Sequence, residues 1–273
     1  MELSLPGGVL KYYNQDVFAK AAISVLHYEA LKSQNKFDKL FQTKKHLISK
    51  YDSNIVVKNA IDYYLYLLGQ PNHTPKEKHT TILRKLNVAN QELAKNGAKK
   101  IKPGSTVFVH SLTNQVFDIL KYASKYKHFS VNILDHSPLY ISRELKKHLD
   151  QKIYLFPDLA LKQAIKSADL CLIGADVISK KGVIAKLGSH LASVVASQYN
   201  VLFYVCAHTW MYDSKDEMTR LLTNEYTSAE QDYKATHEFF SYDLVNSIIC
   251  ESGILKPKHL SSEVKFYNKW MFI

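Results

Sequence analysis

Residues 169–209 read DLCLIGADVISKKGVIAKLGSHLASVVASQYNVLFYVCAHT, and this stretch decides the fold class. An apolar run over Leu170–Ile173 ends in Gly174-Ala175-Asp176, and a second run over Val201–Cys206 ends in Ala207-His208-Thr209. Both runs have the length of buried strands, and the residues between them have the length of a helix. Ligands of open α/β sheets bind beyond the carboxyl ends of the strands. We therefore expect one pocket at the tips of these two strands, with Asp176 in it.

Three further apolar runs precede this stretch, at Thr106–Val109, Phe129–Leu134 and Ile153–Phe156. Strands that alternate with helix-length segments indicate βαβ units and a parallel sheet. The nine glycines contain no G-x-G-x-x-G, so the dinucleotide fingerprint is absent. We expect a polar excursion from Asp213 to Thr236 over the pocket or an interface, and a final helix at Tyr242–Cys250. The sequence predicts a Rossmann-like C-terminal domain over residues 104–273.

The first hundred residues have helical patterning. Asp16 can cap a first helix that includes Phe18 and Leu26, and Leu40–Ile48 indicates a second. A third helix is expected from Asn54 to Leu68, and a fourth from Thr74 to Ala94 that stops at Asn96-Gly97. Residues 1–103 are therefore predicted to form an N-terminal helical domain. The fold class is α/β, a helical subdomain followed by a mainly parallel sheet.

Composition limits the cellular setting. Of the 273 residues, 46% are hydrophobic and 22% charged, which is ordinary for a folded soluble protein. No apolar run approaches the ~20 residues of a membrane span, and residues 1–16 lack the pattern of a secretion signal. Cys171, Cys206 and Cys250 lie in apolar patterns without metal-type spacing. We expect a cytoplasmic protein with buried thiols, no metal, no cofactor and no membrane contact.

The formal net charge of +11 favours an acidic partner, such as RNA or an acidic protein surface. The alternative is that lysines are spread over solvated helix faces. No run of five basic residues occurs, and Lys99-Lys100 with Lys102 is the nearest approach. We therefore expect that nucleic-acid binding is not the main function.

Three loops are expected to meet at the strand tips. A loop that opens a helix offers free backbone N–H groups to a phosphate, and a lysine and a carboxylate could hold the rest of a sugar phosphate or nucleotide. Each side chain also has an ordinary explanation: His110 as a hydrogen-bonded histidine, Lys186 as a solvated lysine, and Asp176 as a local cap. The candidate ligand-binding residues are His110, Ser111, Thr113, Asn114, Gly174, Asp176, Lys186, Gly188, His208 and Thr209.

The same stretch resembles a known family. The pattern GA[DE]-x-V-x-x-x-G-x-I-x-K-[IL]-G-[TS] matches Gly174–Ser189, and Leu202–Ala207 is similar to the family strand PFYV-x-A. The likeness continues at Gly253–Pro257 and, more weakly, at Asp16–Leu26. The family unites the initiation factor 2B alpha, beta and delta subunits with methylthioribose-1-phosphate and ribose-1,5-bisphosphate isomerases. The resemblance implies a helical N-terminal domain and a Rossmann-like C-terminal domain.

Departures from the family pattern bear on catalysis. The resemblance implies that catalysis by the isomerases uses a cysteine directly after the loop histidine, together with the aspartate of the GAD motif. In this chain Ser111 replaces that cysteine, and Asp176 is the retained aspartate. Asn114 and the element Asp135–Pro138 lack the cations of the family, and the N-P-x-F-D element is eroded to His237–Ser241. A hydroxyl has a far higher pKa than a thiol at ~8.5, so serine cannot simply replace it as a proton carrier.

The resemblance therefore favours an alpha-like regulatory subunit of the guanine-nucleotide exchange factor for initiation factor 2. It would form a homodimer through the C-terminal domain, bridge beta- and delta-like subunits, and help sense the phosphorylated alpha subunit of initiation factor 2. The alternative is a sugar-phosphate aldose–ketose isomerase acting on ribose 1,5-bisphosphate through Asp176 and Ser111. A nucleotide-binding module of unrelated function is a third reading. The exact subunit type stays open.

Overall fold

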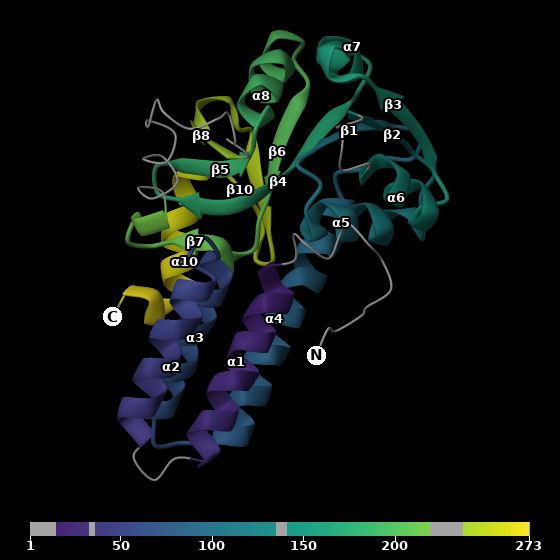
Figure 1. Cartoon of the computed structure of the whole chain (residues 1–273). Helices are drawn as coiled ribbons and strands as arrows, with labels where there is room; N and C mark the ends of the chain where they lie inside the picture. Colours follow the sequence, from purple (N-terminus) through teal and green to yellow (C-terminus); the bar gives the residue numbers. More distant parts are fainter. Residues whose placement is uncertain (1–14, 33–35, 135–140, 219–236, 273) are drawn as a thin grey trace.

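Four helices come first in the computed structural model, which describes residues 15–32, 36–134, 141–218 and 237–272. They are α1 (Gln15–Lys32), α2 (Lys36–Lys50), α3 (Ile55–Gly69) and α4 (Pro75–Ala98). In Figure 1 they stand side by side below the sheet region. The predicted α/β class, with helices followed by a mainly parallel sheet, is confirmed.

Side-chain caps set the starts of two of these helices. The Asn54 side chain accepts a hydrogen bond from Val57 N at 3.0 Å. Thr74 and Glu77 form a reciprocal capping box at the start of α4, with Pro75 at its first position. Asp16 differs from its predicted capping role, because it lies within the first turn of α1, is buried, and binds side chains of other elements.

The main sheet has the order β10-β9-β6-β4-β1-β2-β3. Six of these strands run parallel, and only the terminal β9–β10 pair is antiparallel. Helices connect the strands, as predicted for βαβ units. The strands are β1 (Thr106–His110), β2 (Ser130–Leu134), β3 (Lys152–Phe156), β4 (Leu170–Ser179), β6 (Leu202–Cys206), β9 (Ser247–Cys250) and β10 (Gly253–Leu255); the helices are α5 (Asn114–Ser124), α6 (Ile141–His148), α7 (Leu161–Lys166), α8 (Ser189–Gln198) and α10 (Leu260–Tyr267).

The strand β4 is longer than its apolar run predicts. Its first half pairs with β1 and β6, and its second half pairs with β5 (Gly182–Lys186) and β7 (Tyr212–Asp213) in a smaller second sheet. The strand β8 (His237–Ser241) extends this second sheet beside β5. Asp176 therefore lies inside a strand, where β4 passes from one sheet to the other, and not in a loop beyond its end.

The predicted helix at Tyr242–Cys250 is wrong. A single 3-10 turn, Tyr242–Leu244, leads into β9, which pairs in parallel with β6. The consecutive β-branched residues Ile248 and Ile249 are fully buried in that strand, a setting that suits them better than a helix. Most of the predicted polar excursion at Asp213–Thr236 lies outside the described residues.

Buried apolar side chains of the described residues form two clusters, and the larger one joins the helices to the sheet. It runs without a break from α1 and α3 into β4, β5 and β6. Asn59 of α3 also crosses this contact, because its buried side-chain amide donates to the backbone oxygens of Trp210 at 2.8 Å and Tyr212 at 3.0 Å. The division into domains at residues 103 and 104 stays a prediction.

Replacing Asn59 tests this contact. In Asn59→Ala two buried carbonyls lose their donor, which costs about 1–3 kcal/mol. We expect the free energy of unfolding in urea to fall by that amount. The matched control is Asn72→Ala, an exposed asparagine of the α3–α4 turn, which should change it by less than ~0.5 kcal/mol. Equal small effects would contradict the role of Asn59.

Candidate functional site

The candidate site lies between β1 and β4. The chain extends the sheet from β1 to β2 and β3 on one side, and β4 then pairs on the other side of β1. Such a reversal of strand order leaves a crevice at the carboxyl ends of the two strands, where α/β proteins bind ligands. The loop after β1 and the middle of β4 meet there, because Gly174 N donates to Ser111 O at 3.1 Å.

Gly174 allows this close approach. A Cβ atom at this position would lie 2.3 Å from Ser111 O and 2.4 Å from Thr113 Oγ1, so a larger residue would push the β1 loop away. Ser111 itself has φ +50, in the left-handed region that non-glycine residues seldom adopt. The neighbouring strand therefore holds a sharp turn between β1 and α5, and such strained backbone is typical of functional sites.

The β5–α8 loop closes the other side of the site. His110 Nε2 lies 2.9 Å from Leu187 O, and Lys186 N donates to Ser111 Oγ at 3.4 Å. Gly188 has φ +95, and a Cβ there would lie 3.1 Å from His110 Nε2. The structure thus brings His110 and Ser111 against the segment that contains Lys186 and Gly188.

Asp176 occupies a β-bulge, since the β4–β5 register shifts between Ala175 and Val177. Bulges turn a side chain away from its regular direction. Gln15 Nε2 donates to Asp176 Oδ1 at 3.2 Å and to its backbone oxygen at 3.0 Å. Asp176 Oδ2 lies 3.3 Å from His237 Nε2, and the same ring nitrogen lies 2.5 Å from Lys186 Nζ. One imidazole nitrogen therefore stands between a carboxylate and an amine.

The charges of this cluster stabilise the ionised carboxylate. Burial disfavours the charged form of Asp176, but the hydrogen bond from His237 and the charge of Lys186 outweigh it and hold its pKa below the usual value. Burial lowers the pKa of Lys186, and the charge of Asp176 offsets this only in part. The cluster therefore has an acceptor in Asp176 and a weakened cation in Lys186.

His208 and Thr209 belong to a second network at the end of β6. His208 is fully buried, and its Nε2 lies 3.1 Å from Asp16 Oδ1. Asp16 Oδ2 also accepts from Asn90 at 3.0 Å and Gln115 at 3.3 Å. Thr209 donates to Glu251 and accepts from Asn268. These contacts connect helices and sheet, and the ligand role of both residues stays a prediction.

The N-cap residues of the two helices at the site form no side-chain cap, but at the start of α8 His190 N donates to Glu238 Oε1 at 2.8 Å. Thr113, the N-cap of α5, is buried and makes no such bond, and Asn114 begins the helix. Gly188 is the N-cap of α8. Backbone N–H groups at such ends suit an anion. Sequence patterns alone missed Gln15 and His237, because their contacts with Asp176 join segments 161 and 61 positions apart, although His237 stood in the eroded family element.

A profile of the Initiation factor 2 subunit family matches residues 17–257. The chain belongs to this family. The match extends from α1 to the end of β10 and so includes both strand tips of the candidate site.

Relatives within the Initiation factor 2 subunit family fall into two groups. The eIF-2B subunit 2-like protein of Pyrococcus abyssi is 26% identical over 190 residues, which are 67% of this chain and 69% of the relative. The ribose 1,5-bisphosphate isomerase of Methanocaldococcus jannaschii is 23% identical over an alignment of 276 positions. This alignment covers 92% of this chain and 90% of the relative. The family therefore includes initiation-factor subunits and isomerases, and identity alone does not separate them.

Solved structures of the family share the fold. The translation initiation factor eIF-2B of Pyrococcus horikoshii superposes with a TM-score of 0.73 at 20% identity, covering 91% of this chain and 96% of that one. A chain of the tetrameric eIF2B-beta2-delta2 complex of Chaetomium thermophilum gives a TM-score of 0.71 at 17% identity, with coverages of 91% and 89%. At these identities the likeness concerns the fold alone.

The three thiols of this family member are buried, and none stands at the position of Ser111. Cys171 and Cys206 are fully buried inside strands, and burial raises the pKa of both well above the usual value. Burial raises the pKa of Cys250 to about 11. Within the described segments no group of His, Cys, Asp and Glu is arranged to hold a metal ion. None of the described helices is long and apolar enough to span a membrane.

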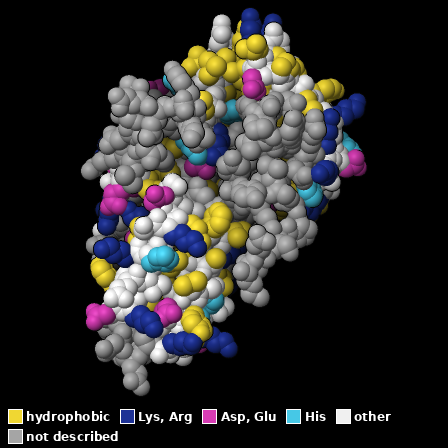
Figure 2. Space-filling view, viewed as in Figure 1, with side chains coloured by type: hydrophobic (Ala, Val, Ile, Leu, Met, Phe, Trp, Pro, Cys, Tyr) yellow, Lys and Arg dark blue, Asp and Glu magenta, His cyan; other side chains and the backbone are white. Residues whose placement is uncertain are grey.

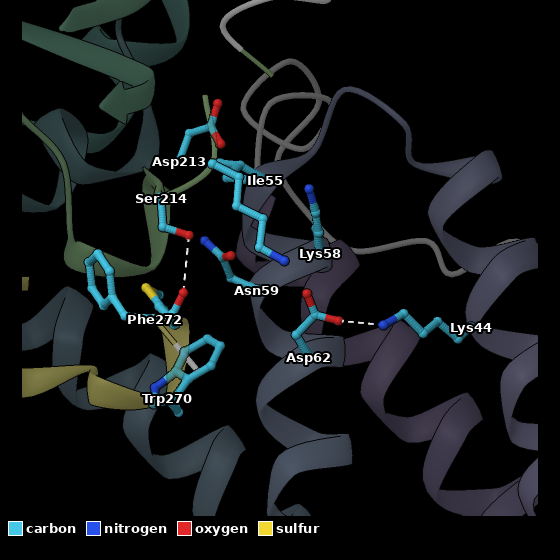
Figure 3. A pocket seen from close by; sticks show the side chains of 11 residues that line it. Lys44, Ile55, Lys58, Asn59, Asp62, Asp213, Ser214, Trp270 and Phe272 are labelled. Atoms are coloured by element: carbon cyan, nitrogen blue, oxygen red, sulfur yellow. Dashed lines mark hydrogen bonds and ion pairs between the residues drawn. The ribbon is translucent and has the colours of Figure 1, made fainter. Parts of the chain in front are cut away.

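A separate cavity of about 430 Å³ lies between α2, α3 and the C-terminal 3-10 helix Lys269–Phe272 (Figure 3). Lys44 Nζ donates to Asp62 Oδ1 at 2.7 Å along its rim, and Lys58 pairs with Glu217. Trp270 forms part of the opposite wall and packs its ring against Tyr63 and Trp210. Because these acid–base pairs are satisfied within the chain, we assign the cavity to the contact between helices and C-terminus.

The buried His208–Asp16 pair predicts a pH dependence. Burial disfavours the imidazolium, but the charge and hydrogen bond of Asp16 prevail and raise the pKa of His208 above 6.5. The folded state therefore binds this proton more tightly, so its stabilisation is complete below pH 6.5 and is lost as pH rises through the folded pKa. We expect the free energy of unfolding, measured in urea, to fall as the pH rises from 6.5 through the folded pKa of His208.

His208→Gln is the matched variant, because its amide can still donate to Asp16 but does not titrate. Its free energy of unfolding should be lower at pH 6 and change less with pH than that of the unaltered protein. Parallel pH curves for the two proteins would show that His208 is neutral in the folded state and that the pair is not ionic.

Proposed function

We propose that the chain is a non-catalytic, alpha-like regulatory subunit of the guanine-nucleotide exchange factor for translation initiation factor 2. In this role it acts in the cytoplasm, bridges beta- and delta-like subunits, and helps sense phosphorylated initiation factor 2. Ser111 supports this proposal most directly. It occupies the strained turn where the resemblance places the thiol of the isomerases, and the three cysteines of the chain lie elsewhere with raised pKa values.

The state of Asp176 supports the same function. Its carboxylate accepts a hydrogen bond from Gln15 and faces His237, and its pKa is lowered. A general acid–base group works best with a pKa near the operating pH, and a carboxyl with a lowered pKa departs from that. The pocket retains features that suit an anionic ligand, namely the uncapped start of α5 and Lys186. A sugar phosphate or nucleotide bound there would be a structural effector.

An exposed apolar surface on the C-terminal half supports a homodimer. Figure 2 shows hydrophobic side chains gathered at the end of the molecule where α7 and α8 lie in Figure 1. Leu159, just before α7, is 100% exposed, and Leu187 and Leu191 beside α8 are 55% and 56% exposed. Large exposed apolar patches mark protein interfaces. The beta–delta tetramer of Chaetomium thermophilum shows that chains of this fold assemble with one another.

The positive charge of the chain suits a contact with phosphorylated initiation factor 2. A phosphorylated residue adds about −1.5 to −2 charges, and the net charge here is +11. The helices α1–α4 are the part expected to contribute to that contact. Binding of the alpha subunit of initiation factor 2 should therefore be tighter in its phosphorylated form.

The second candidate function is ribose-1,5-bisphosphate isomerase. The Methanocaldococcus jannaschii enzyme aligns over 92% of this chain, and Asp176 is present at the site. In that reaction Asp176 would move the proton, with Ser111 in the place of the thiol. The hydroxyl of serine in the place of that thiol makes this the weaker candidate.

An activity assay separates the two functions. Purified protein incubated with ribose 1,5-bisphosphate should show no turnover above a blank, because Ser111 stands in place of the thiol and the lowered pKa of Asp176 keeps its carboxyl ionised. Asp176→Asn is the matched control and should give the same trace. Turnover by the unaltered chain that disappears in Asp176→Asn would overturn the regulatory proposal.

The predicted dimer has its own test. Leu191→Glu places a charge in the apolar patch of α8, so we expect the dimer to become a monomer in size-exclusion chromatography with light scattering. Phe266→Glu on α10, where the ring is 69% exposed, should leave the dimer intact. A monomeric unaltered chain at micromolar concentration would contradict the prediction. Native mass measurement of the complex isolated from the source cells should show beta- and delta-like partners.

A further inference from the structure

We infer that the edge of the sheet opposite the Asp176 site binds single-stranded nucleic acid. The parallel strands β1, β2 and β3 all begin at this edge, and α5 ends there. Three separate segments of the chain supply its lysines. Lys100, Lys102, Lys127 and Lys152 line its two hollows, and Lys125 follows the end of α5, against two aspartates, Asp150 and Asp169.

The loops that hold these lysines are fixed to one another. Gly104 N donates to His128 O at 2.8 Å, and Ser130 N donates to Ser105 O at 2.9 Å. Gln151 joins the third segment, because its side chain donates to Lys127 O at 3.2 Å and accepts from Phe129 N at 2.8 Å. A surface ordered before binding loses little conformational entropy when a ligand arrives.

The lysines are not neutralised by acidic neighbours. Among the described residues no carboxylate forms an ion pair with Lys100, Lys102, Lys125 or Lys152, and Asp169 instead accepts from Thr106 N at 2.7 Å. Lysines at helix C-termini also complement the helix dipole, and Lys127 does so by donating to Ala98 O and Ile101 O. That role does not account for Lys102 and Lys152, which are exposed beside strand starts.

Two adjacent hollows lie at this edge. One, of about 700 Å³, lies beside Tyr126 and Lys152, and the other, of about 400 Å³, lies beside Lys100 and Lys102. Pro103-Gly104 lines both, so the two hollows meet at this turn.

An exposed aromatic ring beside the lysines favours a single-stranded nucleic acid over other anionic partners. Tyr126 is 73% exposed at the first hollow, and its position beside lysines matches the stacking surfaces that bind unpaired bases. A double helix hides the faces of its bases, whereas a single strand exposes them. An acidic protein would use the lysines but would gain little from stacking on Tyr126. This inference is independent of the exchange-factor role.

The test uses fluorescence anisotropy with a labelled 12-nucleotide oligouridylate, across a salt series. Lys102→Ala/Lys125→Ala/Lys152→Ala should weaken binding at least tenfold and reduce the slope of log affinity against log salt by about 2, since each single-strand phosphate contact contributes roughly 0.7. Tyr126→Ala should weaken binding about five- to tenfold with the salt slope unchanged, because stacking releases no counterions.

The control removes the same charge elsewhere. Lys258→Ala/Lys265→Ala/Lys269→Ala changes three exposed lysines near the C-terminus and should alter affinity less than twofold. Equal losses in the two triple variants would show that net charge alone attracts the oligonucleotide, which overturns the inference. So would an unchanged affinity in Tyr126→Ala together with equal binding of polyglutamate, an outcome that would assign this edge to an acidic protein.

Discussion

A buried carboxylate, Asp16, determines how the helices meet the sheet. It comes from the first turn of α1, yet its partners are Asn90 of α4, Gln115 of α5 and His208 at the end of β6. A buried charge is tolerated only when it is paired and hydrogen-bonded, so these four elements are held in one arrangement. The adjacent Gln15 is thereby directed at Asp176. The candidate site thus depends on a contact outside the sheet.

Much of the fold could be predicted from local signals. Asn54 and Thr74 are caps whose chemistry acts within one turn, and five apolar runs matched five strands of the main sheet. The errors arose where strand pairing decides the structure. Ile248 and Ile249 form a strand because β6 offers an unpaired edge, and the second half of β4 exists because β5 folds back upon it. The partner of β9 lies 43 positions away, outside any local window, whereas β5 follows β4 after a short turn and is a hairpin that the apolar runs did not reveal.

The residues of the candidate site at the strand tips could be predicted from the sequence. The side chains from other elements that contact them could not. His110, Ser111, Gly174 and Lys186 meet as their positions beside strands indicated. His208 and Thr209 also lie at a strand tip, but His208 pairs with Asp16 and Thr209 donates to Glu251. Position relative to a strand therefore located the site, whereas the partners of each side chain distinguish ligand-facing groups from structural ones. Those partners come from α1 and β8, which carry no motif for this purpose.

The left-handed turn at Ser111 also bears on how the chain could change. The unusual feature of this turn is its backbone conformation, and Gly174 makes room for it because glycine has no side chain. Serine and cysteine differ by a single atom at the end of a short side chain, and both would stand on this turn in the same way. The backbone geometry of the turn is thus the same whether the side chain ends in oxygen or in sulfur. A lineage with this chain would need one oxygen-for-sulfur exchange, and no rebuilding of its architecture, to explore thiol chemistry.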